Sequence, residues 1–313
     1  DVIFKDLRFA VVDEQHRFGV NQRLELGKKG SFVDILIMTA TPIPRSLALA
    51  QYGDMDISII KQKPPGRKPI NTALVSSARI DEVVDKLKKS IDKGAQAYWV
   101  CPLIEESEIL HYTAAERRFE QLRAKLGEGV VELVHGKMSS ETKDKIMDRF
   151  VSGNTKLLVA TTVIEVGVNV PSANIMVVEN AEKFGLAQLH QLRGRVGRGV
   201  NQSTCLLLYK EPLNISSKKR LSILRETEDG FKISEVDLNL RGSGDAIGTA
   251  QSGLPRFRMA NIEIIEMLME TAHQQARYLL AKDPNLETPQ GKAARNLLWL
   301  MDQDKSIRLI TVG

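Results

Sequence analysis

Short apolar runs rich in Val, Ile and Leu recur along the chain and predict the strands of a sheet. The runs show no strict alternation of apolar and polar positions, which is typical of strands that are covered on both faces. They span Phe9 to Val12, Ile35 to Met38, Ala97 to Cys101, Val130 to Val134, Leu157 to Ala160, Ile175 to Val178 and Cys205 to Tyr209.

Helical patterns lie between these runs. The first has apolar residues at the i, i+3, i+4 spacing, namely Ile80, Val83, Val84, Leu87 and Ile91, and Gly94 follows it as a stop signal. A second helix is predicted to start at the capping pair Thr113 and Glu116 and to end before Gly127. Strands that alternate with helices predict an α/β fold with a parallel sheet.

Changes in composition divide the chain into segments. Residues 61–72, K-Q-K-P-P-G-R-K-P-I-N-T, are rich in Pro and Lys and predict a linker. The two strands in residues 1–60 are few for an independent sheet, so this piece is expected to be half of a domain. Residues 73–213 hold five predicted strands and form a complete doubly wound unit. Residues 214–258 combine helical patterns with a glycine-rich loop, and residues 259–313 are expected to be a helical tail.

Composition narrows the protein class only slightly. The chain has 313 residues, 42% of them apolar, and a net charge of +5, too mild to indicate a polyanion partner without other signals. Cys101 and Cys205 both lie in apolar runs, so neither a disulfide framework nor a cysteine metal site is expected. No leader or membrane-spanning run is evident. We therefore expect a cytoplasmic protein without a membrane partner.

Two acidic residues, Asp13 and Glu14, come directly after the first apolar run. Loops at the carboxyl ends of parallel strands build binding sites. In such a loop one carboxylate can hold Mg²⁺, here Asp13, while its neighbour orients or deprotonates an attacking water. The alternative is an ordinary solvated turn between a strand and a helix.

An arginine-rich octet, Q-L-R-G-R-V-G-R, runs from Gln191 to Arg198. Its glycines permit close backbone approach, and Arg195 and Arg198 can present planar donors to the γ-phosphate of a nucleotide. A solvated basic helix face is the alternative. The octet predicts a phosphate-directed cluster made of Gln191, Arg195 and Arg198.

Small polar residues follow several of the other predicted strands. Thr39 and Thr41 stand in T-A-T-P-I-P-R, and their hydroxyl groups could link the nucleotide state to a facing domain by hydrogen bonds. His135 follows the run 130–134, and Thr161 and Thr162 follow the run 157–160. Polar groups at these two strand ends suit contacts to phosphate and sugar that carry no sequence information. Surface turns without a ligand are the alternative for each of them.

These segments together resemble superfamily 2 helicases. The strings V-V-D-E-Q-H-R-F-G-V-N-Q-R and E-N-A-E-K-F-G-L-A-Q-L-H-Q-L are similar to the RecG-type branched-DNA helicases. The resemblance implies catalytic roles for Asp13, Glu14, Gln191, Arg195 and Arg198, coupling roles for Gln15, His16, Thr39 and Thr41, DNA contacts from His135, Thr161 and Thr162, and nucleotide contacts from Gly167 and Asn169. Asn169 stands where the family usually has Asp, which leaves an amide in place of a carboxylate.

The glycine-rich segment from Asp229 to Gly253 resembles the translocation motif that these helicases share with the transcription-repair coupling translocase. Arg241 and Gln251 match the polar residues that join the loop of that motif to its helical hairpin. The resemblance therefore implies that these two side chains couple nucleotide turnover to DNA movement.

The resemblance as a whole implies the C-terminal part of an ATP-dependent DNA helicase that remodels stalled forks and Holliday junctions in repair and recombination. Residues 1–60 would be the C-terminal half of motor domain 1, 73–213 RecA-like motor domain 2, 214–258 the translocation motif and 259–313 its tail. No window of the chain fits the phosphate cradle G-x-x-x-x-G-K-[ST]. We expect the isolated chain to be inactive and to act with the missing N-terminal half of the same protein, ATP, Mg²⁺ and branched or duplex DNA.

Two other functions remain open at this point. A translocase of the transcription-repair coupling type shares the tail motif, but its carboxylate motif usually lacks Gln15 combined with Gln22 and Arg23. A nucleic-acid-binding module without hydrolysis would keep the fold alone, and the intact acidic and arginine motifs argue against it.

Overall fold

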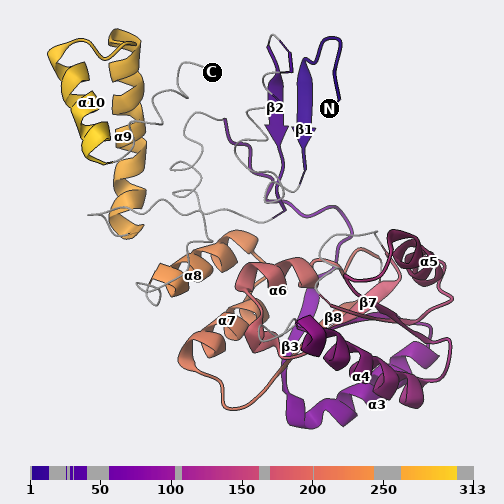
Figure 1. Cartoon of the computed structure of the whole chain (residues 1–313). Helices are drawn as coiled ribbons and strands as arrows, with labels where there is room; N and C mark the ends of the chain where they lie inside the picture. Colours follow the sequence, from indigo (N-terminus) through magenta and orange to yellow (C-terminus); the bar gives the residue numbers. More distant parts are fainter. Residues whose placement is uncertain are drawn as a thin grey trace. The chain divides into compact units, whose positions relative to one another are not determined.

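The computed structural model describes residues 2–13, 26, 29–30, 32–40, 56–102, 108–161, 170–199, 201–242 and 262–301. The chain forms two compact units (Figure 1). The first comprises residues 1–42 and 60–244, and the second comprises residues 43–59 and 245–313. Apart from the end of the linker, the boundaries predicted for the five segments remain predictions.

A six-stranded sheet forms the centre of the first unit. Its strands are β3 (Ile70–Ser76), β4 (Gln96–Val100), β5 (Val131–Val134), β6 (Leu157–Ala160), β7 (Ala173–Val178) and β8 (Ser203–Tyr209). They lie in the order β3-β8-β7-β4-β6-β5, and every neighbouring pair is parallel. The predicted parallel α/β class is confirmed.

Helices cover both faces of this sheet (Figure 1). The buried residues of α3 (Ile80–Asp92) and α4 (Glu108–Leu126) pack on one face, and those of α5 (Ser140–Val151), α6 (Leu186–Arg193) and α7 (Ile215–Glu226) pack on the other. Successive side chains of β4 point to opposite faces, so Trp99 lies in the first layer and Tyr98 in the second. Burial on both sides explains why the strands read as continuous apolar runs.

Two further strands, β1 (Phe9–Val12) and β2 (Asp34–Ile37), form a separate parallel pair. Both strands were predicted, with β2 shifted by one residue. Val12 is buried, whereas Phe9, Val11 and Leu36 are exposed. This pair therefore leaves apolar side chains uncovered among the described residues.

The linker prediction for residues 61–72 is wrong at its end, because β3 begins at Ile70. The segment I-N-T-A-L-V-S has polar residues at its second and third positions and does not read as an apolar run. β3 lies at the edge of the sheet and pairs only with β8. An edge strand is less enclosed than a central one, so it tolerates Asn71, which is exposed, while the buried Thr72 hydroxyl donates to the carbonyl oxygen of Ile70. The large sheet formed by the described residues consequently has six strands, whereas five were predicted for residues 73–213.

The predicted start of the second helix is also wrong. α4 begins at Glu108, so Thr113 and Glu116 lie inside it and do not cap it. The same pair of residue types can occur within a helix, where the i, i+3 spacing also places them on one face. The predicted ends of α3 before Gly94 and of α4 before Gly127 are confirmed.

The C-terminal part of the described chain is helical. It comprises α7, α8 (Gly230–Gly242), α9 (Ile262–Lys282) and α10 (Pro289–Leu300). Two short 3₁₀ helices, Ser77–Arg79 and Ala181–Lys183, lie earlier in the chain. α9 ends before Asp283 as predicted, whereas its predicted start at Met259 lies outside the described residues. The Asp283 carboxylate accepts the backbone N–H groups of Glu287 and Thr288 at 2.9 and 2.8 Å, which shapes the turn into α10.

A membrane span requires a helix of about 20 mostly apolar residues. None of the helices formed by the described residues is both long and apolar enough to cross a bilayer.

Candidate functional site

Two residues predicted to contact DNA lie at the same edge of the sheet. His135 follows β5 and Thr161 follows β6, and the last residues of these strands, Val134 and Ala160, are register partners. Thr161 is only 2% exposed. Burial lowers the pKa of His135, and nearby Lys143 adds to this effect while Glu116 opposes it. Their role in DNA binding remains a prediction.

A half-buried polar cluster lies at the ends of β4 and β7. The Glu179 carboxylate accepts two hydrogen bonds from Arg118, at 2.8 and 2.7 Å, and a third from Trp99 Nε1 at 3.0 Å. Such a two-point ion pair is geometrically specific and ties α4 to the end of β7. Burial raises the pKa of the neighbouring Cys101 thiol, which excludes a thiolate nucleophile there at neutral pH.

The arginine-rich octet continues from α6 into a tight loop, residues 194–199, which we call the arginine loop. Gly197 has a φ of +78°, a conformation that side chains other than that of glycine rarely adopt. A Cβ atom at Gly197 would lie 2.9 Å from Ile70 Cγ1 at the start of β3. The loop therefore packs closely against the start of β3.

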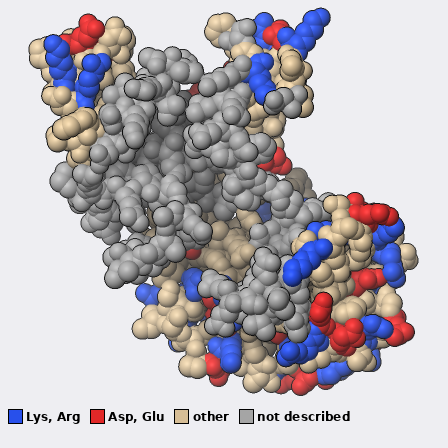
Figure 2. Space-filling view, in the orientation of Figure 1, with Lys and Arg blue, Asp and Glu red and all other residues tan. Residues whose placement is uncertain are grey.

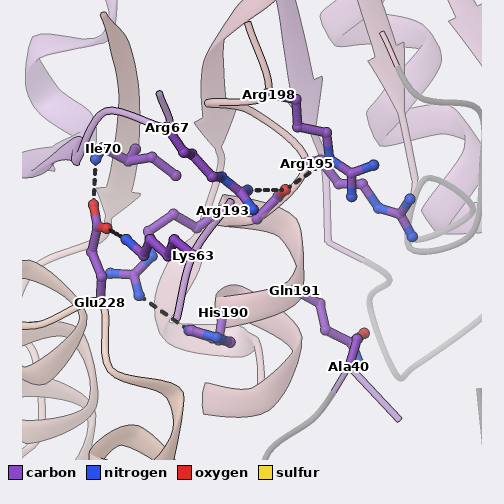
Figure 3. A pocket seen from close by; sticks show the side chains of 11 residues that line it. Ala40, Lys63, Arg67, Ile70, His190, Gln191, Arg193, Arg195, Arg198 and Glu228 are labelled. Carbon is purple, nitrogen blue, oxygen red and sulfur yellow. Dashed lines mark hydrogen bonds and ion pairs between the residues drawn. The ribbon is translucent and has the colours of Figure 1, made fainter. Parts of the chain in front are cut away.

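The arginine loop borders a cavity of about 290 Å³ (Figure 3). The lining residues are Ala40, Lys63, Arg67, Ile70, His190, Gln191, Arg193, Gly194, Arg195, Arg198 and Glu228. Five of them are lysine or arginine and one is acidic, so the cavity concentrates positive charge. A concave surface lined by one sign of charge attracts a polyanion such as a phosphate group.

The three residues selected in the octet are brought together in this cavity. Gln191, Arg195 and Arg198 all line it, and in Figure 3 the Arg195 and Arg198 side chains extend to one side of the loop while Glu228 and Lys63 lie on the other. Arg198 Nε also donates to the carbonyl oxygen of Gly194 at 3.2 Å, within the loop itself.

The first arginine of the octet has a different role. Arg193 is only 3% exposed, and its Nη1 donates to the carbonyl oxygens of Leu224 and Thr227 at 2.5 and 2.9 Å. These bonds tie the end of α6 to the end of α7. Arg193 falls four residues after buried Leu189 in α6, so helical periodicity was the signal for its burial.

His190 lies beside Arg193 in the same helix, with 3.1 Å between its Nδ1 and Arg193 Nη2. Burial lowers the pKa of His190 to about 4, the positive charges of Arg193 and Lys63 add to the effect, and Asp229 opposes it. The imidazole is therefore neutral at pH 7, and its Nδ1 accepts a hydrogen bond from the guanidinium.

The depressed pKa of His190 predicts a pH-dependent stability. Between pH 6.5 and 4 the unfolded chain binds a proton at this site that the folded chain does not bind. Stability is thus retained above pH 6.5 and falls by up to about 3 kcal/mol as the pH drops to 4. His190→Gln should flatten this part of the profile in urea unfolding followed by circular dichroism. His273→Gln, in the other unit, is the control, and an unchanged slope in His190→Gln would contradict the assignment.

Sequence reasoning missed three of the residues that line the cavity. Lys63 and Arg67 belong to the predicted linker, and Glu228 follows α7. Glu228 forms an ion pair with Lys63 and accepts the backbone N–H of Ile70. A signal existed in P-P-G-R, because Pro followed by Gly is typical of a type II turn.

The other predicted residues are only partly described. Asp13 and Thr39 follow β1 and β2 and are exposed. Arg241 lies in α8, but its side chain is outside the described part of the structure. Also outside it are Glu14, Gln15, His16, Thr41, Thr162, Gly167, Asn169 and Gln251.

The metal prediction for Asp13 remains a prediction. Within the described ranges, no group of three or more His, Cys, Asp or Glu side chains could hold a metal ion.

Surface charge does not add a second site on the face seen in Figure 2. Basic and acidic side chains intermingle over the described atoms of this face. The mild net charge therefore does not indicate where an anion binds, whereas the concentration of basic side chains in the cavity does.

Two family models match the chain. The helicase conserved C-terminal domain covers residues 79–200, which include strands β4 to β7 of the six-stranded sheet and the arginine loop. The model for domain 3, C-terminal, of the ATP-dependent DNA helicase RecG covers residues 227–312.

Curated proteins that are similar to this chain are also named ATP-dependent DNA helicase RecG. The ATP-dependent DNA helicase RecG of Acidithiobacillus ferridurans is 50% identical over 283 residues, which are 90% of this chain and 41% of the relative. That of Bacillus subtilis is 46% identical over 309 residues, which are 97% of this chain and 45% of the relative. The chain thus spans less than half the length of these relatives.

A solved structure, that of RecG bound to a three-way DNA junction, is also similar. It aligns with a TM-score of 0.68 and 43% identity, over 87% of this chain and 34% of that one. The likeness therefore extends to both the sequence and the fold.

Proposed function

Because the chain belongs to the RecG family of ATP-dependent DNA helicases, whose C-terminal region it matches, we propose that it is the second motor half of such a helicase. The observation that carries this proposal is the basic cavity bordered by Gln191, Arg195 and Arg198. Its chemistry suits the terminal phosphate of a nucleotide bound against the other motor domain.

In this proposal the arginine loop stabilises charge during ATP hydrolysis. Bound ATP supplies the phosphoryl group that is transferred to water. Arg195 and Arg198 donate hydrogen bonds to the γ-phosphate oxygens as negative charge develops there, and Gln191 adds a polar contact. Asp13 holds Mg²⁺, and Glu14 orients the attacking water. The surplus of basic side chains in the cavity supports this fit, since an anion would reduce their mutual repulsion.

DNA binding and coupling complete the proposed function. His135, Thr161 and Thr162 contact the DNA backbone, and Gly167 and Asn169 contact the nucleotide. Coupling is assigned to Gln15, His16, Thr39 and Thr41, and in the tail motif to Arg241 and Gln251. The solved relative is bound to a three-way junction. We therefore assign branched DNA, such as a stalled fork or a Holliday junction in repair and recombination, as the substrate of the complete protein.

Phosphate release tests the proposal. The complete protein, with an N-terminal part that carries the phosphate cradle, should hydrolyse ATP in the presence of a three-way junction at least about tenfold faster than without DNA. The isolated chain should show no hydrolysis above background, because most phosphate contacts of such motors come from that cradle.

Each outcome separates the alternatives. Absence of hydrolysis in the complete protein, together with retained DNA binding, would indicate a binding module. Equal stimulation by linear duplex and by junction would favour a translocase of the transcription-repair coupling type.

A further inference from the structure

We propose that Arg67, in the segment that precedes the sheet, is a positioning residue that sets the orientation of the arginine loop. The inference rests on the proposed function of Arg195 and Arg198. It assigns a role to residues 63–70, which we call the docked segment and which composition alone presents as a linker.

The Arg67 guanidinium spans the arginine loop. Its Nε donates to the carbonyl oxygen of Gly197 at 3.1 Å. Its Nη2 donates to the carbonyl oxygen of Gly194 at 3.2 Å, and this second bond is drawn in Figure 3. These two carbonyls bracket Arg195 in the sequence. Arg198 Nε donates to the same Gly194 oxygen at 3.2 Å. Arg67 therefore holds the backbone from which both proposed phosphate donors project.

Local structure in turn holds Arg67. Residues 64–67 form a turn in which the Arg67 N–H donates to the Pro64 carbonyl at 3.3 Å, and Gly66 has a φ of +81°. Pro65 and Gly66 are the residue types that a type II turn requires at its two central positions. The turn fixes the direction in which the Arg67 side chain leaves the backbone.

Contacts on both sides anchor the docked segment. Before the turn, Lys63 pairs with Glu228. After it, Gln202 Nε2 donates to the Pro69 carbonyl at 2.6 Å, and Ile70 packs against Gly197. Anchored at both ends, the segment leaves Arg67 few alternative positions.

The charges around Arg67 favour a role in positioning the arginine loop over a contribution to the stability of the fold. Burial lowers the pKa of Arg67, and the nearby charge of Arg198 lowers it further. Both guanidinium groups donate to the carbonyl oxygen of Gly194. A lysine would provide one point of attachment, whereas the planar fork of arginine matches two carbonyls at once.

The docked segment also reaches the start of the tail motif. Glu228 binds both Lys63 and the N–H of Ile70, and it lies two residues before α8. Any movement of the segment would therefore act on the arginine loop and on the entry to α8 together. Arg67 is the member of the segment that contacts the loop by hydrogen bonds.

Steady-state kinetics of the complete protein test the role in turnover. Arg67→Ala should lower the kcat of junction-stimulated ATP hydrolysis by about 10- to 100-fold, because small misplacements of a transition-state donor have effects of this size. The KM for ATP should change by less than about threefold. Arg67→Lys should recover only part of kcat, and added guanidinium ion should partly restore Arg67→Ala. Arg79→Ala, which removes an exposed arginine paired with Glu82, is the matched control.

Hydrogen exchange provides a readout without turnover. In the absence of nucleotide, amides of residues 190–199 should exchange faster in Arg67→Ala than in the unmodified protein, and Arg79→Ala should leave them unchanged. Unchanged exchange there would overturn the positioning role, and so would an unaltered kcat. A loss that falls mainly on KM would assign Arg67 to ground-state nucleotide binding instead. No hydrolysis in the unmodified protein would reject the proposed function, while the exchange result would still judge the Arg67 contact.

Discussion

Replacing Arg195 by Ala in the complete protein should lower the kcat of DNA-stimulated ATP hydrolysis by about 10³-fold or more, with little change in the KM for ATP. An arginine that meets charge developing in the transition state contributes about 10³ to 10⁵ in rate in related phosphoryl-transfer enzymes. It contributes less to binding the ground state, so the loss appears in kcat. Arg198→Ala should show the same pattern. Both residues line the basic cavity.

The control for this comparison is Arg149→Ala. Arg149 pairs with Glu132 at 2.7 Å, away from the cavity lining. Its removal should leave kcat and KM within about twofold, because Arg149 does not line the cavity and its partly exposed ion pair contributes little to the stability of the fold. Equal losses in kcat and in ATP affinity for Arg195→Ala would show a ground-state binding role. A normal kcat would remove the arginine loop from the catalytic site.

Trp99→Ala should destabilise the first unit by about 4 kcal/mol, the range for truncating a large buried aromatic side chain. Trp99 is 0% exposed and lies between β4 and the helices of one face. Its Nε1 donates to Glu179 at 3.0 Å, and the Arg118 guanidinium lies 5.8 Å from its ring centroid. Truncation thus leaves a cavity and also removes one donor from the Glu179 carboxylate. Urea unfolding of the chain, followed by circular dichroism, measures the loss.

The chain offers a matched control, because its second tryptophan, Trp299, is 67% exposed. Trp299→Ala should change the free energy of unfolding by less than about 0.5 kcal/mol, as expected for exposed positions. Trp99→Phe fills most of the cavity and isolates the lost hydrogen bond, at a cost of about 1 to 2 kcal/mol. A cost below about 1 kcal/mol for Trp99→Ala would contradict the tight packing of this face.

Local patterns were sufficient for most of the fold. Apolar runs located seven of the eight strands that the described residues form, since burial on both faces demands continuous apolar residues. The spacing of Val83, Val84 and Leu87 predicted α3 because a helix places residues three and four apart on one face. Gln191, Arg195 and Arg198 could be grouped in advance because they lie within eight residues along one turn and its loop. Their proximity is a property of the contiguous chain.

Contacts between distant segments decided the remainder. β3 was missed because its strand character comes from pairing with β8, more than a hundred residues away, and not from its own pattern. Lys63 and Glu228 meet although 165 residues separate them. The octet alone could not show that Arg67 binds its loop. Hydrogen bonds and ion pairs of this kind leave no periodic trace in a sequence, because they depend on the path of the chain between the partners. For this reason the phosphate-directed arginines were visible in the sequence, whereas the segment that positions them appeared only in the folded structure.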